Sequence, residues 1–230
     1  MRYIFILFIL LSSLYAKTYE FSGGKNNPVQ IIGSKILKVA YTRAHISMKP
    51  KFVQLQVALE LSNSGITDGE LVRIKKINNT YKNLLIVPVP LVTVEAMAFS
   101  KDSSIHINKW SDLKNYNFTI IRGAKFIEKS TQHMNKEFVN NFQEAFENLD
   151  TNETQIVVVP KLAGLKSIFL NNYYDIKPVS KPLQSLKLYH FVHKKNKHLI
   201  KIITPILQTM KETGEITYWQ NAYLRSITPH

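Results

Sequence analysis

The sequence contains no cysteine in its 230 residues. A disulfide framework is therefore excluded, and so is a lipid tether on an N-terminal cysteine. The HExxH zinc motif, the GxxxxGK phosphate loop and the GxSxG nucleophile elbow are absent as well. His190 and His193 stand three residues apart on a predicted strand, so they point to opposite faces. We identify no catalytic residue, metal site or cofactor, and we expect a protein that is not an enzyme.

Acidic residues are scarce relative to basic ones. Asp and Glu number 16 against 30 Lys and Arg, which gives a formal net charge of +14. Such an excess suits a nucleic-acid binder, a protein on an anionic membrane, or a solvated surface around an anion-binding cleft. The lysines are scattered rather than interleaved with aromatic residues in one stripe. No nucleic-acid partner is therefore expected, and a solvated surface accounts for most individual lysines.

The N-terminus has the layout of a secretory signal peptide. Met1 and Arg2 precede the apolar run 3–11, and two serines then lead to Ala16. Cleavage is predicted after Ala16, so that residues 1–16 are the signal peptide. A membrane anchor would need about 20 apolar residues, and the serines and Lys17 end this run too early. We expect a soluble periplasmic protein that is monomeric.

Strand and helix patterns alternate along the remaining chain. The apolar and β-branched segments that predict strands are 17–21, 52–55, 68–72, 84–87, 118–121, 156–159 and 186–192. Helices are predicted from Pro28, over 57–64, from Lys125 and from Pro160, with two more at the C-terminus, the first stopped by Gly214. This alternation is typical of an α/β fold.

The region 84–100 divides this pattern into two α/β units. Pro88 and Pro90 are expected to end the strand at 84–87, because proline cannot donate to a sheet ladder. The run 92–100 is then a separate extended segment, after which the alternation starts again. The chain is long enough for two lobes of about 100 residues each.

Short strings follow one another in a recognisable order and spacing. They are Ala58-Leu59, Asn63-Ser64-Gly65, the segment 68–74, Tyr81-Lys82-Asn83-Leu84, the segment 87–91, the segment 110–114, Arg122-Gly123, Tyr189-His190 and the segment 210–216. Together they resemble family 3 extracellular solute-binding proteins, which include the polar amino acid receptors of ABC importers. The resemblance extends over nearly the whole chain after residue 16.

The resemblance implies a type II periplasmic-binding-protein-like fold of two lobes. Lobe 1 would comprise 17–100 plus 191–230, and lobe 2, residues 101–190, would be inserted between two hinge strands. Such receptors close on a small molecule by hinge motion. The implied function is capture of a polar solute for the permease of an ABC importer. The alternatives are a sensing or interaction protein of the same fold that signals to a membrane partner, and a small exported dehydratase.

The resemblance also implies where a ligand binds. Arg73 lies in the cleft-lining stretch, where a guanidinium grips a carboxylate through two hydrogen bonds; the alternative is a surface arginine at a strand end. Glu70 would receive a ligand cation or hold Arg73 in place, or form only a salt bridge. In lobe 2, Gly123 begins a helix whose backbone amides suit an anion, and Arg122 and Lys125 strengthen that preference.

Two weaker candidates and two departures complete the predicted site. Ser22 and Gly23 are included because they end the first strand. Val57 stands where related sequences commonly carry arginine, and no acid lies near Pro160, where the amino acid receptors hold the α-ammonium group. A buried ammonium without an acidic partner is costly. The predicted ligand is therefore small and polar, either anionic or amino-acid-like.

Overall fold

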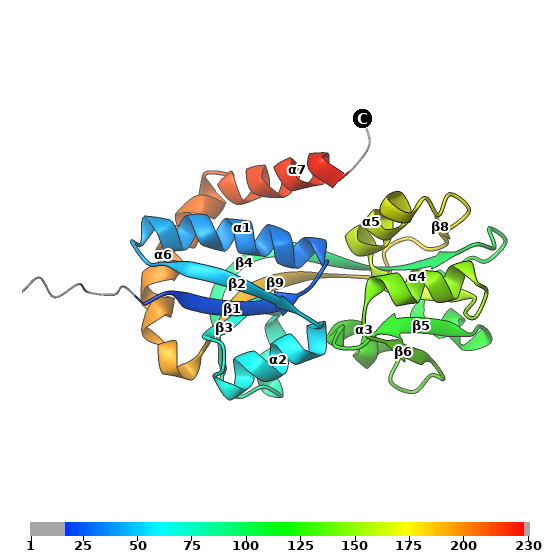
Figure 1. The fold of residues 1–230 in the computed structure, drawn as a ribbon, viewed down its shortest axis with the longest axis horizontal. Coiled ribbons are helices and arrows are strands. Elements are labelled where there is room, and N and C mark those ends of the chain that lie inside the picture. Colours follow the sequence, from blue (N-terminus) through cyan, green and yellow to red (C-terminus); the bar gives the residue numbers. More distant parts are fainter. Residues whose placement is uncertain (1–16, 228–230) are drawn as a thin grey trace, which may run out of the picture.

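The computed structural model describes residues 17–227 and contains one mixed β-sheet shared by two lobes (Figure 1). The predicted signal peptide, residues 1–16, lies outside the described residues. The strand order is β2-β1-β3-β9-β4-β7-β5-β6, with β8 beside β4. Helices cover the sheet in both lobes (Figure 1). The predicted α/β fold class, in which each lobe is built on a mixed sheet flanked by helices, is confirmed.

The elements follow the predicted alternation, and their bounds are as follows. The strands are β1 (Tyr19–Gly24), β2 (Met48–Val53), β3 (Gly69–Ile74), β4 (Leu84–Ser100), β5 (Phe118–Ile121), β6 (Glu137–Val139), β7 (Ile156–Pro160), β8 (Lys177–Pro178) and β9 (Gln184–His193). The helices are α1 (Pro28–Arg43), α2 (Leu55–Ser64), α3 (Lys125–Ser130), α4 (Phe142–Asp150), α5 (Lys161–Asn171), α6 (His198–Glu212) and α7 (Glu215–Ile227), with short 3₁₀ turns η1 (Lys75–Asn79), η2 (Trp110–Asn115) and η3 (Lys194–Asn196).

The first lobe is built around the parallel strands β2, β1 and β3. Helices α1 and α2 lie on opposite sides of these strands (Figure 1). Helix α1 begins where Asn27 caps it, since the Asn27 Oδ1 atom accepts a hydrogen bond from the Val29 amide at 3.2 Å. Gly65 ends α2 in a left-handed conformation, with φ at 80°. The β1–α1 turn, which Asn27 ends, and the β2–α2 turn lie together at the edge that faces the second lobe.

Strands β4 and β9 run through both lobes and pair with each other along their length. Pro88 and Pro90 lie inside β4, so the expectation that they end a strand is wrong. The β4–β9 ladder shifts register between Ile86 and Pro90 and again between Pro90 and Val92. At such irregular positions a proline removes no regular ladder hydrogen bond, which is why the strand continues through them.

The second lobe contains the parallel strands β7, β5 and β6, with β4 antiparallel to β7. All five residues of β7 are buried, as expected for a strand covered on both faces. The Phe99 and Phe146 rings pack with their centroids 5.8 Å apart in the core of this lobe. Gly164 of α5 permits close approach, because a Cβ there would lie 2.4 Å from the Phe99 ring.

The C-terminal helices return the chain to the first lobe (Figure 1). The buried face of α6 carries Leu199, Ile203, Leu207 and Met210, as the sequence predicts. Helix α7 is held by two hydrogen bonds from Arg43 to Glu215, at 2.8 and 2.9 Å. Within residues 17–227, no helix combines the length and the apolar character needed to cross a bilayer.

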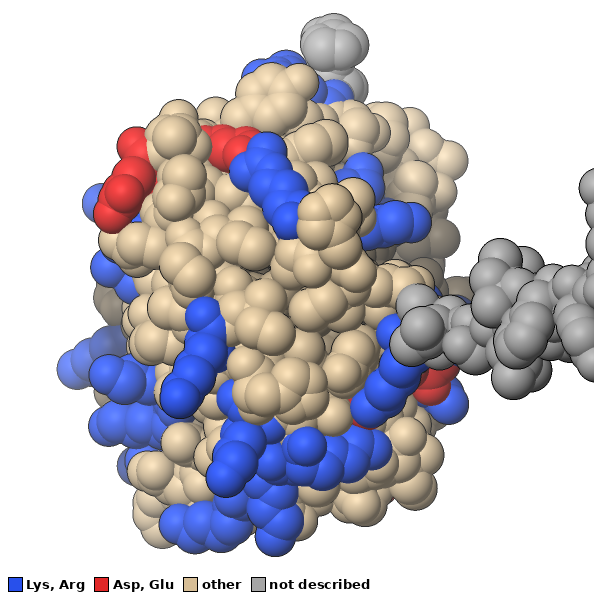
Figure 2. Space-filling model, turned by 90° about the vertical axis from the view of Figure 1, so that its left-hand side faces the viewer, with Lys and Arg blue, Asp and Glu red and all other residues tan. Residues whose placement is uncertain are grey.

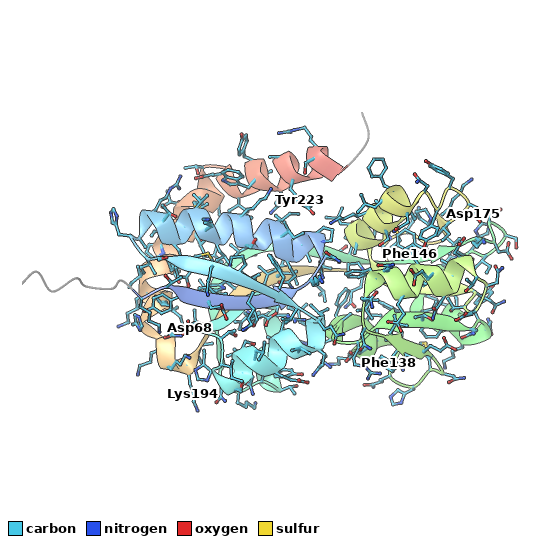
Figure 3. All side chains as sticks on the ribbon, in the orientation of Figure 1. Asp68, Phe138, Phe146, Asp175, Lys194 and Tyr223 are labelled. Atoms are coloured by element: carbon cyan, nitrogen blue, oxygen red, sulfur yellow. The ribbon has the colours of Figure 1, made fainter. Side chains whose placement is uncertain are left out.

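The basic excess is visible at the end of the first lobe that points away from the second (Figure 2). Asp68 and Lys194 lie at this end (Figure 3). The Lys17 and Lys195 ammonium groups both contact the Asp68 carboxylate, at 3.3 and 3.4 Å. One carboxylate is thus shared by two lysines. Much of the positive charge therefore lies on a solvated surface that is remote from the lobe boundary.

Candidate functional site

A buried arginine joins the two lobes. Arg73 is at the end of β3, and only 6% of it is exposed. Its Nε atom donates to Glu70 at 2.7 Å and its Nη2 atom to the Leu55 carbonyl at 2.6 Å. Its Nη1 atom donates to the carbonyl of Gly123 in the second lobe at 3.2 Å. One guanidinium therefore holds β3, the start of α2 and the β5–α3 turn of the opposite lobe together.

Glu70 is completely buried beneath Arg73. Its Oε2 atom accepts hydrogen bonds from Ser62 at 3.1 Å and from Ser22 at 3.3 Å. Burial raises the pKa of Glu70 above its ordinary value, while Arg73 and the two hydroxyl groups oppose that rise. The carboxylate has no route to solvent, so its evident role is to fix the direction of the Arg73 side chain.

The second lobe contributes the turn between β5 and α3. Gly123 adopts φ of 89°, a conformation that favours glycine. Its amide donates to Glu128 Oε1 at 2.5 Å, and the Lys125 ammonium lies 2.7 Å from Glu128 Oε2. The position predicted for an anion is therefore filled by the chain's own carboxylate. Glu128 was not predicted as a site residue, although its spacing of three residues from Lys125 was a usable signal.

The space beside Arg73 is small. Its volume is about 40 Å³, and it lies between the lobes. It is lined by Asn27, Val29, Gln30, Leu55, Val72, Arg73, Ile74, Ile77, Val94, Gly123, Ala124, Lys125, Phe126, Pro160 and Leu188. No Asp or Glu is among these lining residues, although Glu95, 3.2 Å from the Lys161 ammonium group, lies near Pro160 outside this cavity. A cavity of this size holds only a few water molecules, and the Arg73–Gly123 hydrogen bond closes the lobes at this point.

The structure brings most of the predicted site residues together. Ser22, Glu70 and Arg73 form one hydrogen-bonded network, which reaches Gly123 directly and Lys125 through Glu128. Gly23 lies beside this network.

A Cβ at Gly23 would lie 2.6 Å from Leu71 and 2.7 Å from Gln30, so Gly23 serves close packing. Arg122 lies outside the network, because it is exposed and its guanidinium lies 4.8 Å from the Phe138 ring, near β6 (Figure 3).

Two polar residues of α1 were missed by the sequence analysis. Asn27 is 3% exposed and Gln30 is 2% exposed, and both face the lobe boundary. The Gln30 Nε2 atom donates to the Val72 carbonyl at 2.9 Å, whereas its Oε1 atom has no partner in the described chain. Asn27 precedes Pro28 and so carried a capping signal. Nothing in the sequence distinguishes Gln30 from an exposed helical glutamine.

A buried histidine lies behind Glu70 in the same sheet. His190 is 0% exposed, and its Nδ1 atom lies 2.9 Å from the Glu70 carbonyl. A carbonyl only accepts, so Nδ1 carries the proton and Nε2 accepts from the Tyr41 hydroxyl at 2.9 Å. Burial lowers the pKa of His190 from 6.5 to about 4. No group of three or more His, Asp or Glu side chains in the described residues is arranged to hold a metal ion.

We expect stability to fall in acid because of His190. Its folded pKa of about 4 lies below its ordinary 6.5, so the folded state holds it neutral. The stability that depends on neutral His190 is fully present above pH 6.5 and is lost as the pH falls toward 4, at about 3 kcal/mol in total. Urea unfolding at pH 7, 5.5 and 4 measures the loss. His190→Asn should decline less steeply than wild type, and an unchanged slope would contradict this assignment. His106→Asn, at an exposed histidine, is the control.

Comparisons with known proteins place this geometry in a recognised fold. No protein-family model matches the sequence, and no curated protein is significantly similar to it. Among solved structures, the chain has the fold of the two-lobe periplasmic binding proteins, so the predicted resemblance is confirmed at the level of fold. The similar structures described next are sensing or binding proteins rather than enzymes.

A histidine kinase sensor domain with similarity to periplasmic binding proteins aligns with a TM-score of 0.78 at 14% identity, covering 90% of this chain and 96% of that one. A mutant arginine-binding protein from T. maritima aligns at 0.75 and 14% identity, covering 90% and 95%. A solute receptor for L-cysteine from Neisseria gonorrhoeae aligns at 0.73 and 12% identity, covering 91% of each chain.

Proposed function

We propose that the chain is an exported, monomeric periplasmic receptor that holds a small polar molecule between its lobes for the permease of an ABC importer. The observation that carries the proposal is Arg73, a buried cation placed where the two lobes touch. Burying a charge is costly unless it is paired. A cation that bridges two lobes connected by β4 and β9 suits a protein whose closure is controlled at Arg73.

Opening of the lobes would make Arg73 available to a ligand. Separation breaks the hydrogen bond from Arg73 Nη1 to the Gly123 carbonyl, while Glu70 and its partner Ser22 remain in the first lobe and keep Nε fixed. The released Nη1 group can then donate to a ligand carboxylate. Lys125 and the Gly123 backbone, which are bonded to Glu128 in this structure, face Arg73 from the second lobe. The lack of an acid among the cavity residues favours an anion over an α-amino acid.

A sensor is the second candidate. The observation that favours it is the alignment with a histidine kinase sensor domain at a TM-score of 0.78. In this case a membrane kinase or cyclase recognises the closed conformation of the protein, and the same residues bind the ligand. Neighbouring genes distinguish the two versions, since permease and ATPase genes favour import and a membrane kinase gene favours sensing.

The proposal is tested by a thermal-shift screen of the purified protein against amino acids, dicarboxylates, small anions and sugars. A ligand at about 100 times its Kd adds about 2.7 kcal/mol to stability, which raises the melting temperature visibly. Arg73→Lys, which keeps the charge but not the forked geometry, should weaken binding of the ligand found. Absence of any shift across all classes, with the protein folded, would reject a solute receptor.

A further inference from the structure

A second and larger space lies between the lobes, next to the one that contains Arg73. Its volume is about 500 Å³, within the range of small-molecule sites. The first lobe lines it with the β1–α1 and β2–α2 turns, and the second lobe with the start of α4 and one side of α5. We call this space the amide basin. It shares Asn27 and Leu55 with the cavity at Arg73.

The lining of the amide basin is dominated by carboxamide side chains. Five asparagines and two glutamines are among its 15 residues, and they come from both lobes. Each carboxamide offers a donor and an acceptor side by side. Those of Asn26, Gln54 and Asn140 make no hydrogen bond within residues 17–227, whereas both ends of Asn141 are bonded to Glu144. A hydroxyl group also donates and accepts, so this lining complements a polyhydroxylated molecule. Aspartate and glutamate are absent from these lining residues.

Two lysines give the amide basin its charge. Lys25 follows β1 in the first lobe, and Lys166 lies on α5 in the second. Neither forms an ion pair with any residue of 17–227. Glu144 stands in the first turn of α4, but it is bound by Asn140 and Asn141 and does not line the basin. A bound anion would therefore meet cations from opposite lobes and would draw them together.

Asn27 presents a side-chain donor to the amide basin that the described chain does not use. Its Oδ1 atom is occupied in capping α1 through Val29. Its Nδ2 atom makes no hydrogen bond with the rest of the described chain, although the residue is only 3% exposed. Because Asn27 lines both spaces, a ligand oxygen in the basin is the natural partner for this N–H group.

We infer that the amide basin binds a small polyhydroxylated acid, such as a sugar acid or sugar phosphate, and that this molecule is the ligand on which the lobes close. The inference rests on the proposed receptor function, because it names the ligand class and extends the site at Arg73 into the adjoining basin. The ligand touches Leu55, whose carbonyl accepts a hydrogen bond from Arg73, and Arg73 also donates to the Gly123 carbonyl. Occupancy of the basin and closure of the lobes at Gly123 are therefore linked through the β2–α2 turn.

The test is calorimetry with D-glucuronate, D-gluconate and glucose 6-phosphate, compared with neutral D-glucose and cationic D-glucosamine. At least one acid should bind about tenfold more tightly than glucose, and glucosamine should not bind, since each unpaired lysine strengthens hydrogen bonds to an anion. Lys25→Gln and Lys166→Gln should each remove the preference for the acid. Lys114→Gln, on η2 and remote from both spaces, is the matched control and should bind like wild type.

The substitution Asn27→Asp tests what the Nδ2 donor of Asn27 contributes to ligand affinity. Aspartate caps a helix as well as asparagine does, so the variant should melt like wild type. An oxygen then replaces the Nδ2 donor, and affinity for the acid should fall about tenfold or more, because a charge-assisted hydrogen bond becomes a repulsion.

Unchanged affinity in Asn27→Asp, equal binding of glucosamine, or no binding by any of the three acids would overturn the inference. A ligand from the wider screen that is lost in Arg73→Lys but kept in Asn27→Asp would reject the basin and leave the receptor proposal standing. No ligand of any class would reject both.

Discussion

Arg73→Met is expected to lower the free energy of unfolding by about 3–5 kcal/mol, because it leaves the Glu70 carboxylate buried without a counter-charge. Glu70 is 0% exposed, so water cannot replace the guanidinium. The substitution also leaves the Leu55 and Gly123 carbonyls without their donor. Urea denaturation at pH 7, monitored by circular dichroism, measures the loss.

A double-mutant cycle separates the energetic contribution of the Glu70–Arg73 ion pair from that of side-chain packing. Glu70→Gln keeps the shape and still accepts from Ser62, so the double variant with Arg73→Met should be more stable than Arg73→Met alone. Additive effects of the two substitutions would mean that Glu70 and Arg73 are not coupled. Lys101, which contacts Asp150 at 3.3 Å and Asp175 at 3.2 Å on the surface, offers a control, since Lys101→Met should lower stability far less than Arg73→Met.

The sequence predicted those parts of the fold that local pattern determines. The apolar run in β7, the cap before α1 and the glycine after α2 each identify an element without knowledge of its neighbours. The short strand β6 and the helix α4, at residues 137–150, had no prediction. Whether β4 ends or continues at Pro88 and Pro90 also depends on a partner strand, because the shifted register with β9 is what lets β4 continue.

The candidate site was predictable only in part, because its contacts join residues that are distant in the sequence. Arg73, Glu70 and Gly123 were named from a family resemblance, and the contact of Arg73 with Gly123 joins residues 50 apart in the sequence. Whether such donors face a ligand or a protein carbonyl is decided by lobe closure, which no local pattern encodes. The amide basin illustrates the same limit, because its carboxamides lie on four separate turns and helices that meet only in the folded chain.

Gly123→Ala is expected to open the lobes. A Cβ at this position would lie 2.5 Å from the Gln56 nitrogen and 2.8 Å from the Leu55 carbonyl carbon. These are backbone atoms at the start of α2 in the first lobe, so no side-chain rotation relieves the contact. Rotation about the β4 and β9 connection does relieve it, at the cost of the Arg73–Gly123 hydrogen bond. Small-angle X-ray scattering should therefore show a larger radius of gyration than for wild type.

Gly214→Ala is the matched control for this variant. Its φ of 76° is close to the 89° of Gly123, so both alanines carry the left-handed backbone cost of about 1 kcal/mol. A Cβ at Gly214 meets no atom within 4 Å, so the scattering profile should stay that of wild type. If the closed form is the binding form, Gly123→Ala should also reduce ligand affinity in proportion to the closed population lost. Equal profiles for the two variants would mean that Gly123 does not control closure, and that the lobes are held together along β4 and β9 instead.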